Sequence, residues 1–257
     1  MEPLTLADAT VAANAAAVRE QGPFVYGLTN FVAAPLSANA LLAIGAGPAF
    51  GAAPGWPSAF AAGASAMVIN GAALTSAATP DDLTTAAAAA TAAGTPWVLD
   101  PVAVGAGAPA YDEVMAAVLA AGPSIVRGNA SEVVALAGGD GGGSGVDSTM
   151  DSSDVVDLVA DLARRLGTVV AVSGATDYIS DGTRTVAVPG GSAYMPQVTG
   201  TGCSLGAVCA AFAAVTNPFD AAVAAHAVYA EAGARAEKVA SGSGSFAVAF
   251  VDALNNL

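Results

Sequence analysis

The chain contains the segment Val198-Thr199-Gly200-Thr201-Gly202-Cys203-Ser204-Leu205-Gly206, which leads directly into the apolar run 207–215. Two glycines and two threonines before a helix-forming run predict a loop that ends at a helix N-terminus. The first N–H groups of a helix lack internal partners and carry the positive end of its dipole. Because glycines let an anion approach these groups, the pattern is typical of a phosphate or oxyanion site. A tight turn before a buried helix, with Cys203 as a small core residue, explains the segment equally well.

The composition bounds the class of protein. The 257 residues are 54% hydrophobic and 11% charged, so we expect one domain, 1–257, with a large core. No run of about 18 strongly apolar residues predicts a membrane span, and the acids and Arg19 near the start do not resemble a signal peptide. The net charge of −14 argues against nucleic acid and anionic membranes as partners. Two reduced cysteines, Cys203 and Cys209, fit a cytoplasmic protein.

Scarce residue types exclude several site classes. The only lysine is Lys238, late in the chain, which excludes a Walker A loop and the early-strand lysine of a protein kinase. The only histidine is His226, which argues against a Ser-His-Asp triad or a zinc site; we expect it to be a packed or exposed helix residue. Phosphate binding would therefore depend on backbone amides, a metal ion and a few arginines.

Hydrophobic periodicity predicts alternating strands and helices. Strands are expected at 24–28, 66–70, 97–99, 124–126 and 169–172, with a hairpin of 177–180 and 185–188 around Asp181-Gly182. Helices are expected at 5–20, 35–44, 80–93, 109–121, from 131 onward, and at 154–166, 203–216, 218–239 and 246–257. Loops are expected at 50–58 and 138–153. This alternation predicts an α/β fold with a mostly parallel sheet covered by helices on both faces.

Polar residues follow several predicted strands directly: Asn70, Asp100, Arg127, Asn129 and Ser173. In open α/β sheets the ligand site lies at the carboxyl ends of the strands, so this coincidence favours the anion site over the simple turn. Asp100 and Glu132 are candidate ligands for Mg²⁺, which usually takes one or two carboxylates. Glu132 is also explained as an acid in the first turn of a helix. Arg127 is placed to clamp a phosphate.

Six segments occur in the order found in the hydroxyethylthiazole kinase family of thiamine salvage, which has a three-layer ribokinase-like fold. They are Leu28-Thr29-Asn30, Ser37-Ala38-Asn39-Ala40-Leu41-Leu42-Ala43-Ile44-Gly45-Ala46, Val98-Leu99-Asp100-Pro101-Val102-Ala103-Val104-Gly105-Ala106, Ile125-Val126-Arg127-Gly128-Asn129-Ala130-Ser131-Glu132, Gly145-Val146-Asp147-Ser148 and Val198-Thr199-Gly200-Thr201-Gly202-Cys203. The chain resembles this family from about residue 8 to residue 257. The final Gly-Cys differs from most ribokinase-like proteins, which have Asp at that place.

The resemblance implies ATP-dependent phosphorylation of the alcohol of 4-methyl-5-(2-hydroxyethyl)thiazole, with Mg²⁺, by a homotrimer that holds the thiazole between subunits. It also implies roles for individual residues: Cys203 as catalytic base with Gly200 and Gly202 in its loop, Arg127, Ser173 and Thr199 at ATP, Asp100 and Glu132 at the metal, and Asn30, Asn39, Phe50 and Gly200 at the thiazole. At the helix N-terminus the Cys203 thiol is expected to have a pKa below its free value of about 8.5, although bound phosphates would oppose this.

Some residues depart from the family pattern. Phe50 replaces the usual Met, the following segment is Gly51-Ala52-Ala53-Pro54-Gly55-Trp56, the run 70–74 differs, and Ala175 replaces an acid. Another small-alcohol kinase of the same fold therefore remains an alternative.

Three other classes of protein fit the sequence less well. Cys203 argues against the ADP- or ATP-dependent dehydratase of hydrated nicotinamide cofactors, which has Asp there. The combined acids, arginine and anion loop argue against a non-enzymatic nucleotide sensor. A dinucleotide-binding oxidoreductase is excluded because Gly206 follows Gly202 by four residues rather than three, and because the loop comes late in the chain.

Overall fold

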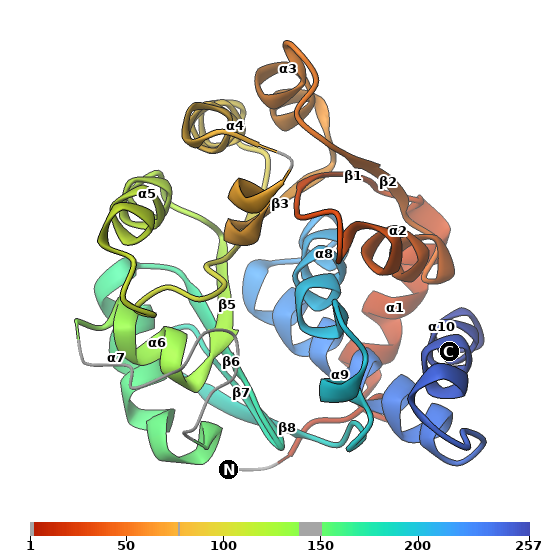
Figure 1. The fold of residues 1–257 in the computed structure, drawn as a ribbon. Coiled ribbons are helices and arrows are strands. Elements are labelled where there is room, and N and C mark those ends of the chain that lie inside the picture. The colour runs from red at the N-terminus through yellow and green to blue at the C-terminus, as the bar shows by residue number, and fades with distance from the viewer. Residues whose placement is uncertain (1–2, 77, 139–150) are drawn as a thin grey trace.

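The computed structural model describes residues 3–76, 78–138 and 151–257. Within them, eight strands form one sheet in the order β2-β1-β3-β4-β5-β6-β7-β8 (Figure 1). The strands are β1 (Phe24–Leu28), β2 (Gly47–Phe50), β3 (Ala66–Asn70), β4 (Trp97–Asp100), β5 (Ile125–Asn129), β6 (Val169–Ser173), β7 (Thr176–Ser180) and β8 (Thr185–Pro189). The first six pair in parallel, and β7 and β8 add an antiparallel hairpin.

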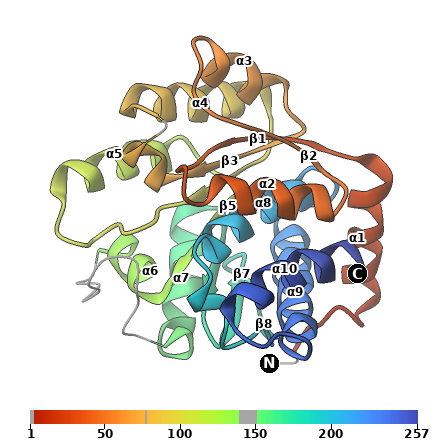
Figure 2. The ribbon, with the colours of Figure 1, turned by 45° about the vertical axis from the view of Figure 1, so that its right-hand side comes forward.

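Helices cover both faces of this sheet (Figures 1 and 2). One face carries α1 (Ala9–Gln21), α2 (Ala34–Ala43), α8 (Thr201–Ala213), α9 (Pro218–Glu237) and α10 (Ser243–Asn255). The other carries α3 (Trp56–Gly63), α4 (Pro80–Ala93), α5 (Pro109–Ala120), α6 (Ala130–Leu136) and α7 (Val156–Leu166). The α8 and α9 helices lie centrally on the first face, and nearly every residue of α8 is buried. The small Ala and Gly side chains of these helices allow close packing on the sheet.

Most predicted elements are confirmed within a few residues at each end. The N-terminal helix begins at Ala9 because Asp8 caps it and ends because Gly22 is left-handed. Two elements, β2 and α3, are not predicted by the sequence patterns. The expected loop 50–58 contains the end of β2 and the start of α3. The segment Gly145-Val146-Asp147-Ser148 and most of the predicted loop 138–153 lie outside the described residues, and the described end of that loop enters a short 3-10 helix, Ser152–Val155.

No helix among the described residues is both long enough and apolar enough to cross a membrane.

Candidate active site

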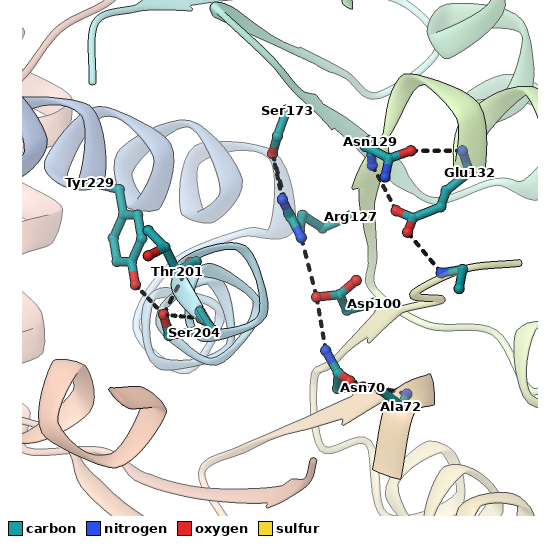
Figure 3. A network of polar contacts seen from close by, with 12 residues as sticks. Asn70, Ala72, Asp100, Arg127, Asn129, Glu132, Ser173, Thr201, Ser204 and Tyr229 are labelled. Atoms are coloured by element: carbon teal, nitrogen blue, oxygen red, sulfur yellow. Dashed lines mark hydrogen bonds and ion pairs between the residues drawn. The ribbon is translucent and has the colours of Figure 1, made fainter. Parts of the chain in front are cut away.

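The parallel register gathers polar side chains at the carboxyl edge of the sheet. Asn70 of β3 pairs with Asp100 of β4, and Asn129 of β5 pairs with Ser173 of β6. Asn70 Nδ2 donates to Asp100 Oδ2 at 3.1 Å, and Arg127 Nη1 donates to the same oxygen at 3.2 Å. Arg127 Nε and Nη2 both donate to Ser173 Oγ, at 3.2 and 2.9 Å. These bonds form a polar row across four strands (Figure 3).

Asn70, Asp100 and Arg127 are buried, and burial acts together with neighbouring charges to set the pKa values of the row. Burial raises the pKa of Asp100 to about 7, while Arg127 lowers this pKa, Glu132 raises it and the hydrogen bond from Asn70 lowers it. Burial by itself lowers the pKa of Arg127, but Asp100 and Glu132 outweigh it and raise that pKa above its ordinary value. Arg127 is therefore a permanent cation held in a fixed position by Asp100 and Ser173.

The N-terminus of α8 lies against this row. Gly200, just before the helix, has φ +86°, and an added Cβ would lie 3.1 Å from Ala33 Cα. A Cβ on Gly202 would lie 3.5 Å from both terminal nitrogens of Arg127. A Cβ on Gly206 would lie 3.6 Å from Asp100 Oδ2. The glycines therefore let the positive end of the helix approach the guanidinium and the carboxylate, as the loop pattern predicted.

Cys203 lies in the first turn of α8 and is partly exposed. The expected lowering of its pKa is wrong for this structure: burial and the negative charge of Asp100 raise the pKa of the thiol to about 11. A hydrogen bond from Asn70 and the charge of Arg127 lower this pKa but do not overcome those two effects. The sequence shows the helix start but not how deeply the thiol is desolvated.

Glu132 caps α6. Its Oε2 accepts from the Asn129 N–H at 2.8 Å, while Asn129 Oδ1 accepts from the Glu132 N–H at 2.9 Å. Its Oε1 accepts from the Ala103 N–H at 2.9 Å, which fixes the loop after β4. Ala103 has φ +64°, a conformation that a non-glycine residue adopts rarely. The structure thus shows the helix-start role that was the alternative for Glu132, and an added role in holding this loop.

The remaining predicted residues take no part in the row. Asn30 is buried and caps the turn before α2, where its Oδ1 accepts from the Ala33 N–H at 2.9 Å. Asn39 is exposed on α2, and Thr199 is exposed just before α8. Phe50 ends β2, and its ring covers Gly27 of β1. In the part of the chain that is described, no hydrogen bond joins Asn39, Phe50 or Thr199 to the row.

The described residues do not form a cluster of metal-ligating side chains. None of their groups of His, Cys, Asp and Glu side chains brings three or more together around a common point. A cation at this site would therefore take most of its ligands from water or from a bound phosphate.

Comparison with known proteins identifies the family. A profile of the Hydroxyethylthiazole kinase family matches residues 15–257. This chain belongs to the hydroxyethylthiazole kinase family.

Similar proteins include hydroxyethylthiazole kinases from two bacteria. The one from Burkholderia pseudomallei (strain 668) is 56% identical over 94% of this chain and 87% of its own length. The one from Leptospira interrogans (serovar Lai) is 46% identical over 93% of this chain and 90% of its own length.

A solved structure shows the same architecture. The hydroxyethylthiazole kinase protein from Pyrococcus horikoshii OT3 superposes with a TM-score of 0.87 at 36% identity, covering 96% of this chain and 93% of that one. The eight-stranded sheet with helices on both faces is therefore the ribokinase-like α/β fold expected from the family, and the family match indicates a kinase rather than the dehydratase of the same fold.

Proposed function

We propose that this chain transfers the γ-phosphoryl group of ATP to the alcohol of 4-methyl-5-(2-hydroxyethyl)thiazole. The observation that carries the proposal is the approach of the α8 N-terminus to Arg127 and Asp100. An anion bound there would meet unpaired amides, a helix dipole and a fixed guanidinium. The hydroxyethylthiazole kinases that share up to 56% of the sequence support the same reaction.

The loop before α8 and Arg127 would together bind the phosphates of ATP. Amides at the start of α8 would hold the transferring phosphoryl group, whose charge spreads over its outer oxygens in the transition state. Arg127, turned by Ser173 toward Gly202, would hold the remaining phosphates of ATP. Thr199 is exposed beside the loop and is proposed to contact ATP as well. Because the guanidinium is already fixed, little conformational entropy is lost when ATP binds.

Asp100 fits a divalent cation. Its Oδ2 accepts from Asn70 and Arg127, whereas its Oδ1 is buried and has no partner among the described residues. An unpaired buried carboxylate oxygen is costly, and a cation would satisfy it. Both oxygens of Glu132 already accept backbone N–H groups, so we propose that Asp100 is the direct ligand and that Glu132 acts through water. A bound Mg²⁺ would neutralise phosphate charge as the reaction proceeds.

Cys203 is proposed as the base that takes the proton of the substrate alcohol. It lies in the same first turn as Gly202 and interacts electrostatically with both Asp100 and Arg127. Since its thiol is neutral at ordinary pH, only a small thiolate fraction would be active, and the proton would be taken as attack proceeds.

The thiazole pocket is proposed to form between subunits of a homotrimer. Gly200 approaches Ala33, at the start of α2, so closely that an added Cβ would lie 3.1 Å from Ala33 Cα, and Asn30 caps the turn before α2. Three apolar side chains here are strongly exposed: Phe31 (69%), Val32 (64%) and Leu42 (59%). A neighbouring subunit that covers them would also close the space beside Gly200, Asn39 and Phe50. The continuous sheet supports residues 1–257 as one domain.

A coupled assay tests the function. Purified protein is incubated with Mg-ATP and either the thiazole or one of a panel of other small alcohols, and the products are identified by mass spectrometry. We expect a phosphate monoester of the thiazole and equimolar ADP. Rapid turnover of another alcohol, with no phosphorylated thiazole at high enzyme concentration, would instead support the alternative small-alcohol kinase.

A further inference from the structure

The α9 helix carries two buried polar side chains on a mostly apolar helix, His226 and Tyr229. They are three residues apart and therefore lie on the same face of the helix. Their neighbours on the buried side of α9 are mainly alanine and valine. Because a buried polar group is costly unless it is hydrogen-bonded, the partners of these two side chains indicate what they do.

Tyr229 contacts the anion loop, the glycine-containing residues 198–202 that lead into α8, through Ser204. The Tyr229 hydroxyl lies 2.5 Å from Ser204 Oγ, which lies 2.8 Å from the carbonyl oxygen of Gly200 and 3.0 Å from that of Thr201 (Figure 3). A serine hydroxyl has one proton, and carbonyl oxygens only accept. Ser204 therefore donates to the loop, and Tyr229 donates to Ser204. This pair fixes the backbone at Gly200, where the chain turns into α8.

His226 reaches the turn between β6 and β7 through Asp177. His226 Nδ1 lies 2.6 Å from Asp177 Oδ2, and Asp177 Oδ1 accepts from the Gly174 N–H at 2.8 Å. Gly174 directly follows Ser173, the residue that holds two nitrogens of Arg127. The other ring nitrogen, Nε2, is buried and has no partner among the described residues. The contact with Asp177 is thus the polar contact that the structure shows for this ring.

We propose that α9 positions both sides of the nucleotide site, the anion loop through Tyr229 and Ser204 and the Ser173 turn through His226 and Asp177. The inference rests on the proposed function, because ATP is the ligand whose binding these two segments would shape. Neither His226 nor Tyr229 is a catalytic residue: each acts by holding a backbone segment. One rigid helix thereby keeps the loop amides and Arg127 in register with each other.

Paired variants test the two contacts separately. His226→Leu removes the hydrogen bond to Asp177 but keeps an apolar side chain of similar reach, and His226→Asn offers an amide N–H near the position of Nδ1. We expect His226→Leu to raise the KM for ATP about three- to tenfold, the cost of one buried hydrogen bond, with little change in the KM for the thiazole. His226→Asn should recover most of the affinity for ATP.

Tyr229→Phe removes only the hydroxyl. Because Gly200 belongs to the loop that holds the transferring group, we expect kcat to fall about three- to tenfold. The Ser204→Ala variant should cost at least as much, because it also removes the bonds to the Gly200 and Thr201 carbonyls. The double variant should cost little more than Ser204→Ala alone, since both single changes remove the Tyr229–Ser204 contact. Val228→Ala is the matched control: it truncates a buried apolar side chain of α9, and it should lower Tm without changing either KM.

The outcomes separate the two proposals. An inactive wild-type protein would overturn the proposed kinase function. An active wild type whose kinetics are unchanged in both His226→Leu and Tyr229→Phe would overturn the positioning role alone. The role would also fail if Val228→Ala changed the kinetics as much as they do, or if His226→Asn gave no recovery. Should His226→Leu not fold, Tyr229→Phe tests the same helix with a smaller change.

Discussion

At Cys203 two groups of effects on one thiol oppose each other. The N-terminus of α8 favours the thiolate, as do Arg127 and the hydrogen bond from Asn70, but burial and the nearby Asp100 carboxylate favour the thiol and prevail. At pH 7 to 8 a thiol with a pKa of about 11 is almost entirely protonated. A base of this kind becomes more available with every step up in pH, so its role can be read from a pH profile.

The first prediction is therefore a pH dependence. If Cys203 is the base, log kcat should rise between pH 7 and 9, because the thiolate fraction increases about tenfold per pH unit below the pKa. Cys203→Ala should lose about 10²- to 10⁴-fold in kcat while it still binds the thiazole. Cys203→Asp should retain substantial activity with a profile shifted to lower pH. A fully active Cys203→Ala enzyme would show that Cys203 is not the base.

The second prediction concerns Asp100 and stability. The pKa of Asp100 is about 7 in the folded protein, against 3.8 for an ordinary Asp side chain as in the unfolded chain. Between pH 3.8 and pH 7, folding is therefore accompanied by the uptake of a proton. This group then stabilises the fold below about pH 4 and loses that contribution as the pH rises through 7. Asp100→Asn cannot ionise, so its Tm relative to the wild type should increase from pH 5 to pH 8. Melting curves in EDTA measure this difference, and one that does not grow with pH would contradict the assigned direction.

The third prediction concerns Phe50. The ring lies over Gly27, where an added Cβ would overlap its edge, so Gly27 provides the space for an aromatic side chain. Phe50→Met, the side chain usual in the family, should alter kcat/KM among alcohols of different size while the KM for ATP stays constant. The same alcohol panel serves as the measurement. Equal changes for every alcohol would mean that Phe50 supports the sheet and does not line the pocket.

At the scale of elements, the start of α8 depends on a backbone that only glycine adopts easily. Gly200 has φ +86°, and a Cβ added there would lie only 3.1 Å from Ala33 Cα in the turn before α2, whereas Gly94 has φ +73° and open space around it. The two positions therefore carry a similar conformational strain for an L residue, and only one of them adds a collision at the site.

The fourth prediction uses this pair. Gly94→Ala should cost about 1 kcal/mol of stability from the left-handed conformation and leave the kinetics unchanged. Gly200→Ala should cost more, because its Cβ would press on Ala33 Cα, and it should also lower kcat/KM for both substrates. Urea unfolding and steady-state kinetics on both variants give the comparison. Equal effects on both assays would show that strain alone matters at Gly200.

The sequence predicted the elements whose patterns are local and strong. The strands 66–70 and 24–28 are confirmed at both ends, and the helix 80–93 is confirmed because Thr79 and Asp82 cap it and Gly94 ends it. The prediction of a loop at 50–58 is wrong at both ends, because one proline just before it and one proline within it are both tolerated in regular structure. Pro48 is tolerated in β2 because this strand forms an edge of the sheet. Pro57 lies in the first turn of α3, where its missing N–H costs nothing.

The candidate site was predicted in part, because its polar row depends on strands whose sequence patterns are local and strong. Polar residues that end parallel strands must meet at one edge, so the gathering of Asn70, Asp100, Arg127 and Ser173 follows from the strand assignments. Contacts made by α9 do not follow, because nothing in a sequence aligns residue 229 with residue 204 or residue 226 with residue 177. A usable signal existed all the same: His226 and Tyr229 are polar, three apart, and on one face of an alanine-rich helix.

At the scale of the whole molecule, large apolar side chains are exposed near the candidate site. Phe31 and Val32 are strongly exposed directly beside Asn30 and the Ala33 contact of Gly200, and Leu42 is exposed further along α2. Aromatic and aliphatic side chains grouped on a surface indicate a contact with another protein. Because these residues adjoin the anion loop, assembly and substrate binding should be linked.

The fifth prediction tests that link. Light scattering of the wild type should give three times the chain mass of 24.5 kDa. Phe31→Asp should shift the mass toward a single chain and raise the KM for the thiazole more than the KM for ATP, because in the proposed trimer the neighbouring subunit would close the alcohol pocket and not the Arg127 side. Val239→Asp is the matched control, since Val239 is equally apolar and 75% exposed but follows α9 and is remote in sequence from the turn before α2. A wild-type monomer with full activity would contradict the shared pocket. A Phe31→Asp trimer with an unchanged thiazole KM would place the interface on another face.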